Sequence, residues 1–194
     1  MSLDILWYLN SLAAISIAEL GDKTQMLTIA LACRGDKYRV FLGSFLGFVV
    51  VNSLCIALGA VVKQLILGIN FRVITAVLFI VVGIFSLRTE SIHENFIKDT
   101  KVAFLTTFTL VSLSEIADKT NLVTLGISFS SPSVFSCFAG MITSAFLMFG
   151  LAVLIGSEIA RYLDIRKLKL FFSFIFIIAG ILMLIGGFFE IMRS

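Results

Sequence analysis

The chain has 194 residues, of which 59% are hydrophobic and 14% charged, and its formal net charge is +3 at pH 7. Soluble domains contain roughly 45–50% apolar and about 25% charged residues, so this composition excludes an ordinary soluble domain. A membrane-spanning helix needs about 20 mostly apolar residues. We therefore predict an all-α integral membrane protein with six transmembrane helices.

Six apolar segments follow one another along the chain. They run over residues 4–33, 40–62, 70–88, 102–129, 133–157 and 169–191. The first and the fourth segments carry charged residues inside them. The longest polar stretch lies near the middle of the chain, between the third and the fourth segments. We expect one unit at 1–90, a central cytoplasmic loop at 91–101 and a second unit at 102–194.

A short motif occurs in the first segment and again in the fourth. It reads AELGDKTQ at residues 18–25 and SEIADKTN at residues 114–121, which is 96 positions later. The two units are therefore repeats of three helices. Because three is odd, the second unit enters the membrane from the opposite side. The sequence predicts two inverted three-helix repeats, an architecture in which transporters hold their substrate near the membrane midplane.

Each motif places three ionisable side chains inside an apolar segment. These are Glu19, Asp22 and Lys23 in the first copy and Glu115, Asp118 and Lys119 in the second. One such residue at the centre of a spanning helix costs about 2.5–3.5 kcal/mol on insertion scales. Six of them would be too costly without mutual pairing or a ligand, and they indicate a functional site.

On a continuous helix, residues three positions apart share a face. Glu19, Asp22 and Gln25 would form one row, and Glu115, Asp118 and Asn121 the other. Symmetry would bring the rows together as a cage of four carboxylates and two amide oxygens, which suits hard divalent cations such as Ca²⁺ and Mn²⁺. Supporting hydroxyl groups come from Thr24, Thr28, Thr120 and Thr124.

The charges of the motifs suggest how transport is coupled. Four carboxylates and two lysines leave a net charge of −2 if all are ionised, which one divalent cation neutralises. Without the cation, repulsion and desolvation favour bound protons, so protons and cation would compete as in an H⁺/cation antiporter. We expect Lys23 to pair within its own helix or to reach an interface, with a charge-balancing role. Gly21 permits a local break, whereas the second copy has Ala117 at that place.

The remaining candidate ligands have plainer interpretations. Cys33, Cys55 and Cys137 lack CxxC spacing and are expected to pack as small apolar side chains. His93, the one histidine, is expected to be a loop residue. We predict no cofactor apart from the transported ion and no nucleic-acid partner, while the lipid bilayer surrounds the chain. The sequence does not predict an oligomeric state.

Basic residues in short loops predict the orientation in the membrane. Ten of the 15 lysines and arginines fall in loops 1–2, 3–4 and 5–6, which we therefore expect in the cytoplasm, with both termini outside. They are Arg34, Lys37, Arg39, Arg88, Lys98, Lys101, Arg161, Arg166, Lys167 and Lys169, against Lys63, Arg72 and Arg193 on the other side.

The duplicated pattern E-x-G-D-K-[TS] resembles that of the Gdt-type family of Ca²⁺/Mn²⁺ transporters, whose bacterial members include manganese exporters. The first copy, ELGDKT, matches fully, and the second, EIADKT, differs only at Ala117. The resemblance implies that Glu19, Asp22, Glu115 and Asp118 bind a cation exported from the cytosol against protons. It further implies a bacterial inner-membrane protein that is a transporter and not an enzyme, with Mn²⁺ favoured over Ca²⁺.

Three alternatives remain open at this point. A Ca²⁺/H⁺ antiporter would use the same oxygen ligands. A passive divalent-cation channel would also need convergent carboxylates. An intramembrane aspartyl protease would use Asp22 and Asp118 as a dyad sharing one proton, which lysines beside both aspartates would oppose.

Overall fold

The structure is a computed structural model that describes residues 3–65, 71–87, 104–116, 118–159, 170, 173–175 and 177–185. Its labelled elements are α1 (Leu3–Glu19), α2 (Lys23–Ala32), α3 (Lys37–Leu65), α4 (Phe71–Leu87), α5 (Phe104–Glu115), α6 (Lys119–Ser130) and α7 (Val134–Ile159). The described residues at 173–175 and 177–185 are also helical. The all-α fold class is therefore confirmed for the described part of the chain.

Several predicted features lie outside the described residues. They are His93, Ala117, the central loop at 91–101 and eight of the loop and terminal basic residues, namely Arg88, Lys98, Lys101, Arg161, Arg166, Lys167, Lys169 and Arg193.

Two of the six predicted spans are not continuous helices. The segment at 4–33 is divided into α1 and α2, and the segment at 102–129 is divided into α5 and α6. Both interruptions fall inside the duplicated motif, between its glutamate and its lysine. The first break lies where Gly21 was expected to permit one, and the second copy is interrupted as well although it lacks that glycine. In each copy an aspartate is the N-cap residue of the following helix.

Within the described ranges, two helices are long and apolar enough to cross a membrane by length and composition. They are α3 and the Val134–Leu154 part of α7, while α4 and the helical residues near the C-terminus form shorter apolar helices. The half-helices α1, α2, α5 and α6 are too short to qualify singly, since they have 17, 10, 12 and 12 residues.

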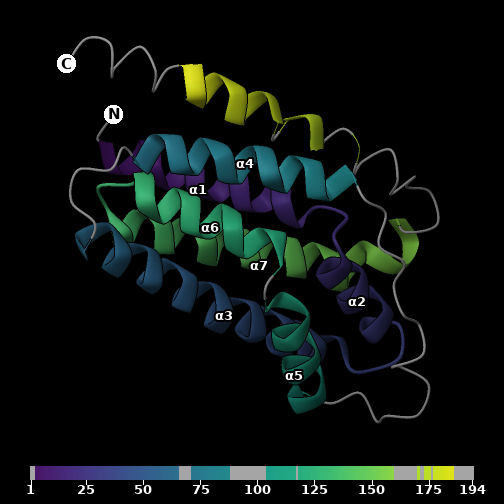
Figure 1. Cartoon of the computed structure of the whole chain (residues 1–194). Coiled ribbons are helices and arrows are strands. Elements are labelled where there is room, and N and C mark those ends of the chain that lie inside the picture. The colour runs from purple at the N-terminus through teal and green to yellow at the C-terminus, as the bar shows by residue number, and fades with distance from the viewer. Residues whose placement is uncertain are drawn as a thin grey trace.

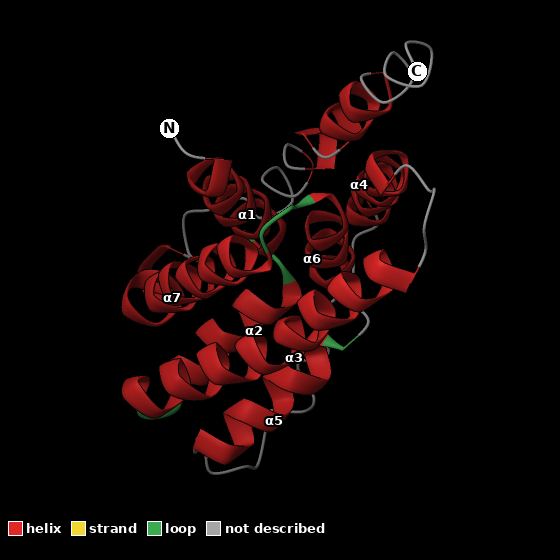
Figure 2. Cartoon of the chain, turned by 90° about the vertical axis from the view of Figure 1, so that its left-hand side faces the viewer, coloured by secondary structure: helices red, strands yellow, loops and turns green. Residues whose placement is uncertain are grey.

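The helices form one bundle (Figure 1). Figure 2 looks nearly along the long helices and shows α2 and α6 in the middle, among α1, α3, α4, α5 and α7. Helix α3 packs along α5, and α1 packs along α7. Because α3 and α7 also contact both α2 and α6, the interrupted region is enclosed by the two longest helices.

Close contacts at glycines repeat between the two halves. A methyl group added at Gly43 in α3 would lie 2.8 Å from the backbone oxygen of Phe104, and one at Gly140 in α7 would lie 2.6 Å from that of Tyr8. Phe104 stands 96 positions after Tyr8. The α3–α5 and α7–α1 contacts are therefore counterparts, and each half packs a long helix on the first half-helix of the other.

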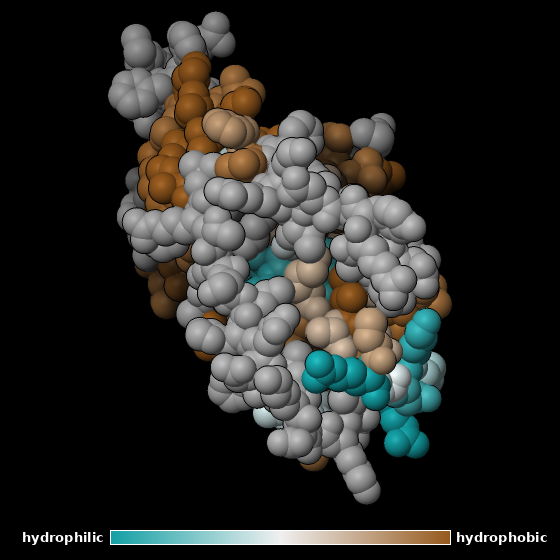
Figure 3. All heavy atoms as spheres, turned by 90° about the vertical axis from the view of Figure 1, so that its right-hand side faces the viewer, coloured by the Kyte–Doolittle hydropathy of each residue, from teal (hydrophilic) through white to brown (hydrophobic). Residues whose placement is uncertain are grey.

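The remaining core is apolar and so is much of the outer surface. Phe48 and Phe149, both fully buried, meet edge-on with ring centroids 5.3 Å apart. Leu54 and Leu58 in α3 and Leu154 in α7 expose between 59% and 71% of their surface. Figure 3 looks onto one end of the bundle and shows hydrophobic side chains toward its upper edge and a group of hydrophilic ones at its lower right. An apolar flank of this kind suits contact with lipid.

Candidate cation site at the two helix breaks

The two helix breaks have the same backbone geometry. Helix α1 ends at Glu19, and Asp22 precedes α2 as its N-cap residue with φ −79° and ψ 165°. Helix α5 ends at Glu115, and Asp118 precedes α6 with φ −81° and ψ 166°. Gly21 has a φ of 68°, a left-handed conformation that glycine adopts without steric cost. Asp22 and Asp118 thus lie at positions where aspartate is favoured.

This geometry corrects the predicted helix faces. Since each helix ends between the glutamate and the aspartate, neither Glu19, Asp22 and Gln25 nor Glu115, Asp118 and Asn121 form a row on one continuous helix. The two helix breaks nevertheless place these six side chains in the interior of the bundle. All six are buried, with exposed fractions between 0% and 8%.

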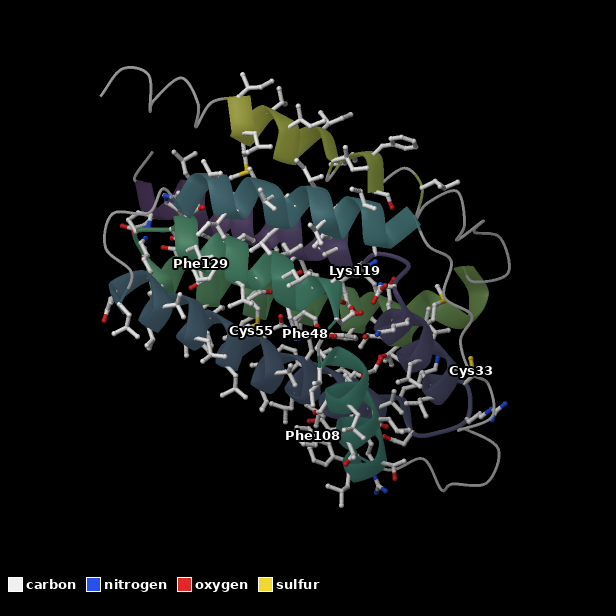
Figure 4. All side chains as sticks on the ribbon, viewed as in Figure 1. Cys33, Phe48, Cys55, Phe108, Lys119 and Phe129 are labelled. Carbon is white, nitrogen blue, oxygen red and sulfur yellow. The ribbon has the colours of Figure 1, made fainter. Side chains whose placement is uncertain are left out.

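The aspartates are paired with lysines from the opposite half of the chain. Lys23 Nζ lies 2.9 Å from Asp118 Oδ1, and Lys119 Nζ lies 2.8 Å from Asp22 Oδ1. Figure 4 labels Lys119, which lies among side-chain oxygens in the interior of the bundle. We expected Lys23 to pair within its own helix or to reach an interface, and the structure instead records an ion pair across the two halves. The lysines therefore balance the charge of the partner motif.

The glutamates are also held from the opposite half. Thr120 donates to Glu19 Oε2 at 3.3 Å, and Thr24 donates to Glu115 Oε2 at 3.2 Å. The two glutamates are 1% and 0% exposed. Each acidic side chain of one motif is thus bonded by a lysine or a threonine of the other motif.

The two amides serve different purposes. Gln25 Oε1 accepts a hydrogen bond of 2.8 Å from the backbone N–H of Gly21, which stabilises the first break. Asn121 instead donates through Nδ2 to the backbone oxygen of Glu115 at 2.7 Å. Its Oδ1 atom stays buried without a hydrogen-bond partner among the described residues. The Asn121 oxygen is thus a free acceptor, whereas the Gln25 oxygen already accepts a bond.

The remaining threonines tie the site to α3. Thr124 donates to Asn52 Oδ1 at 2.9 Å. Thr28 lies within 2.9 Å of Ser44 Oγ and 3.0 Å of the backbone oxygen of Thr24. Thr28 therefore has a packing role between α2 and α3.

Asn52 is a site residue that the motif analysis missed. It lies in the middle of α3, is fully buried, and donates through Nδ2 to Glu115 Oε1 at 3.0 Å. In α3 and α7 the two repeats correspond at an offset of 97 positions, as Gly43 and Gly140 do, so that the counterpart of Asn52 is the apolar Phe149. Asn52 could have been found from the sequence, because it is an asparagine within the apolar run FVVVNSLCIAL. A buried amide in a spanning helix needs polar partners.

Buried oxygens of the site that have no hydrogen-bond partner in the described part of the chain include Glu19 Oε1, Asp118 Oδ2 and Asn121 Oδ1. An unfilled buried acceptor costs about 1–3 kcal/mol, which a bound proton or cation would offset. Among the described residues, no three or more His, Cys, Asp or Glu side chains gather closely enough for one metal ion. In this structure, lysines hold both aspartates.

The comparisons with known proteins agree with the duplicated motif. The family model described as "Divalent cation/proton antiporter GDT1" matches residues 7–94 and 103–190, so that each match contains one motif. A GDT1-like protein of Schizosaccharomyces pombe is 22% identical over 234 residues, covering 92% of this chain and 89% of that protein. No solved structure matches. Because the two matches together span most of the sequence, the chain belongs to the GDT1 family of divalent cation/proton antiporters.

Proposed function

We propose that this protein exports a divalent cation from the cytosol in exchange for protons, with Mn²⁺ as the main substrate and Ca²⁺ as the second. Its family is one of membrane antiporters and not a class of enzymes. The observation that carries the proposal is the reciprocal pairing of the two motifs, since Lys23 meets Asp118 and Lys119 meets Asp22. Residues 96 positions apart thus build one buried polar site.

The cation would be bound by the carboxylates of Glu19, Asp22, Glu115 and Asp118, together with the Asn121 amide oxygen. Mn²⁺ and Ca²⁺ both accept ligand sets of carboxylate and amide oxygens. Gln25 supports the first break. Thr24 and Asn52 donate hydrogen bonds to Glu115, and Thr120 donates one to Glu19. Thr124 donates to Asn52. These bonds orient the two glutamates.

The charge of the site suggests the exchange ratio. Four carboxylates and two lysines carry −2 when all are ionised. One divalent cation or two protons neutralise that charge equally well, and burial makes neutralisation favourable. We therefore propose that two protons replace one cation in each cycle.

For the architecture we propose six membrane passes arranged as two inverted repeats, with both termini outside and loops 1–2, 3–4 and 5–6 in the cytoplasm of a bacterium. The counterpart contacts at Gly43 and Gly140 support the two-fold relation. Two of the six passes would be broken helices, which carry the substrate sites of many transporters near the midplane.

The proposal is tested by uptake of Mn²⁺ and Ca²⁺ into inside-out membrane vesicles, with and without an imposed pH gradient. We expect uptake of Mn²⁺ that is driven by the gradient and abolished by Asp22→Asn or Asp118→Asn. Asp4→Asn is the matched control, because Asp4 is exposed in the first turn of α1, and it should transport normally.

Several outcomes would reject parts of the proposal. Normal transport by both Asp22→Asn and Asp118→Asn would reject the ligand assignment. Uptake of Mn²⁺ at the same rate with and without the pH gradient would reject the proton coupling. Single-channel currents carried by the purified protein would show a channel. The protease alternative is not supported, since each aspartate is paired with a lysine within 2.9 Å and the family is one of antiporters.

A further inference from the structure

We propose that Lys23 and Lys119 are tethered counter-cations, which the transported ion must displace from Asp118 and Asp22, and which thereby select divalent over monovalent cations. This inference rests on the proposed function, since it concerns the same site. It assigns to the lysines a role in specificity and not in coordination.

A lysine and a metal ion would compete for the same aspartate oxygen. Each Nζ lies 2.8 or 2.9 Å from an aspartate Oδ1 atom, and a Ca²⁺ ion on that oxygen would lie at about 2.3–2.6 Å from it. The two positive charges would then be only about 4–5 Å apart, at which separation repulsion in a protein interior reaches several kcal/mol. A metal ion on the other oxygen of the same carboxylate would still be repelled by the lysine, so binding of the ion favours departure of the lysine.

Displacement by different ions has different energies. Na⁺ or K⁺ has the same charge as the ammonium group that it would replace, so the exchange gains little Coulomb energy. A divalent ion brings twice the charge to the same carboxylates and gains more. Because lysine ammonium groups already neutralise the two aspartates, the abundant Na⁺ and K⁺ ions of the cell gain little by binding at this site.

The two lysines differ in exposure, which suggests an order of release. The Lys23 side chain is 32% exposed and that of Lys119 is 13% exposed. A lysine side chain is long and flexible and keeps its ammonium group in water where it can reach it. We infer that Lys23 leaves first in the state described here and that Lys119 follows.

Both ion pairs join one half of the protein to the other. Lys23 begins α2 and Asp118 caps α6, while Lys119 begins α6 and Asp22 caps α2. Without a transported ion, the pairs hold the two broken helices together at their interruptions. Binding of the ion would release this cross-link, so that occupation of the site and movement of the halves are coupled.

The test uses the full chain, purified, with binding of Mn²⁺ measured at fixed ionic strength in Na⁺ or in a large organic cation. We expect wild-type binding to be equal in both media. Lys23→Gln and Lys119→Gln should bind Mn²⁺ on the order of tenfold more tightly in the organic cation, and Na⁺ should compete with Mn²⁺ in these variants. A merely structural lysine would not create competition by Na⁺.

Lys63→Gln is the matched control, because Lys63 donates to the Ser131 backbone oxygen away from the motifs, and it should behave as wild type. Lys23→Arg is a second test variant, which keeps the inference testable if the glutamine variants do not fold. A guanidinium group grips a carboxylate with two parallel hydrogen bonds, so this variant should bind Mn²⁺ more weakly than wild type and remain insensitive to Na⁺.

The outcomes separate this inference from the proposed function. If Asp22→Asn and Asp118→Asn keep normal Mn²⁺ binding, the proposed site itself is wrong. If they lose binding while both glutamine variants keep wild-type affinity and stay insensitive to Na⁺, the lysine inference alone is overturned. Unchanged or tighter Mn²⁺ binding by Lys23→Arg would overturn it as well.

Discussion

At the scale of single residues, Asn52 makes the two halves of the site unequal. Its amide donates to Glu115 Oε1 at 3.0 Å and accepts from Thr124 at 2.9 Å. The equivalent position in the second half is occupied by Phe149, and Glu19 Oε1 has no hydrogen-bond partner among the described residues. Glu115 is thus fixed on both oxygens, whereas Glu19 has one oxygen left for a ligand.

We expect Asn52→Leu to destabilise the protein by about 1–3 kcal/mol, because Glu115 Oε1 and the Thr124 hydroxyl group lose the hydrogen bonds that Asn52 makes with them. It should also weaken Mn²⁺ binding, since Glu115 loses the donor that orients it. Thermal unfolding in detergent and Mn²⁺ titration measure the two effects. Asn10→Leu, an exposed amide on α1, should leave both unchanged, and wild-type Mn²⁺ affinity in Asn52→Leu would contradict the assigned role.

The sequence was sufficient to select the ionisable site residues but not their partners. Charged side chains inside apolar segments are visible without a structure, and the repeat showed that they come in two sets. Which lysine meets which aspartate depends on contacts between residues about 96 positions apart. Local spacing favoured a pair within one helix, which is why the crosswise pairs could not be predicted.

At the scale of the elements, the breaks at the motifs determine the shape of the site. Each break places an aspartate at the start of a half-helix, where the backbone N–H groups of the first turn favour negative charge. The sequence contained part of this signal, since aspartate is one of the residues favoured at the position that precedes a helix. The apolar residues on both sides favoured a continuous span, and the second copy lacks the glycine that marks the first break.

The close helix contacts give a second prediction. We expect Gly43→Ala and Gly140→Ala to lower stability by about 1–3 kcal/mol through overpacking, because the added methyl groups would lie 2.8 Å and 2.6 Å from backbone oxygens. Thermal unfolding in detergent measures this loss. Gly150→Ala is the control, since the nearest atom to its methyl group would be 3.8 Å away. Equal stability of all three variants would contradict the packing.

At the scale of the whole molecule, composition and hydropathy predicted the helical class, and the mean hydropathy of +1.10 agrees with membership of an antiporter family. The arrangement of the helices was predicted in part. An odd number of spans per repeat favoured a two-fold relation, and counterpart contacts are present at Gly43 and Gly140. Which helices touch could not be predicted, because apolar faces in a membrane chain look alike in sequence.

The proposed orientation can be tested with the cysteines of the chain itself. Cys33 is exposed after the end of α2, which corrects the expectation that it packs as a small apolar side chain, whereas Cys55 is half-buried in the apolar middle of α3 and Cys137 is buried. A membrane-impermeant maleimide should therefore label the protein in inside-out vesicles and not in intact cells. Cys33→Ser should abolish the labelling and thereby identify the reactive thiol. Labelling of Cys33 in intact cells would reverse the proposed orientation.

The presence of Asn52 in α3 where α7 has Phe149 affects the resting state of the transporter. If the halves were identical, exchanging their conformations would interconvert the inward-open and outward-open forms, and the two forms would have equal free energy. The amide of Asn52 removes that equality, since only one glutamate can receive its hydrogen bond. In the proposed architecture of inverted repeats, this hydrogen bond would favour one side for loading of the empty carrier, before any ion gradient acts on it.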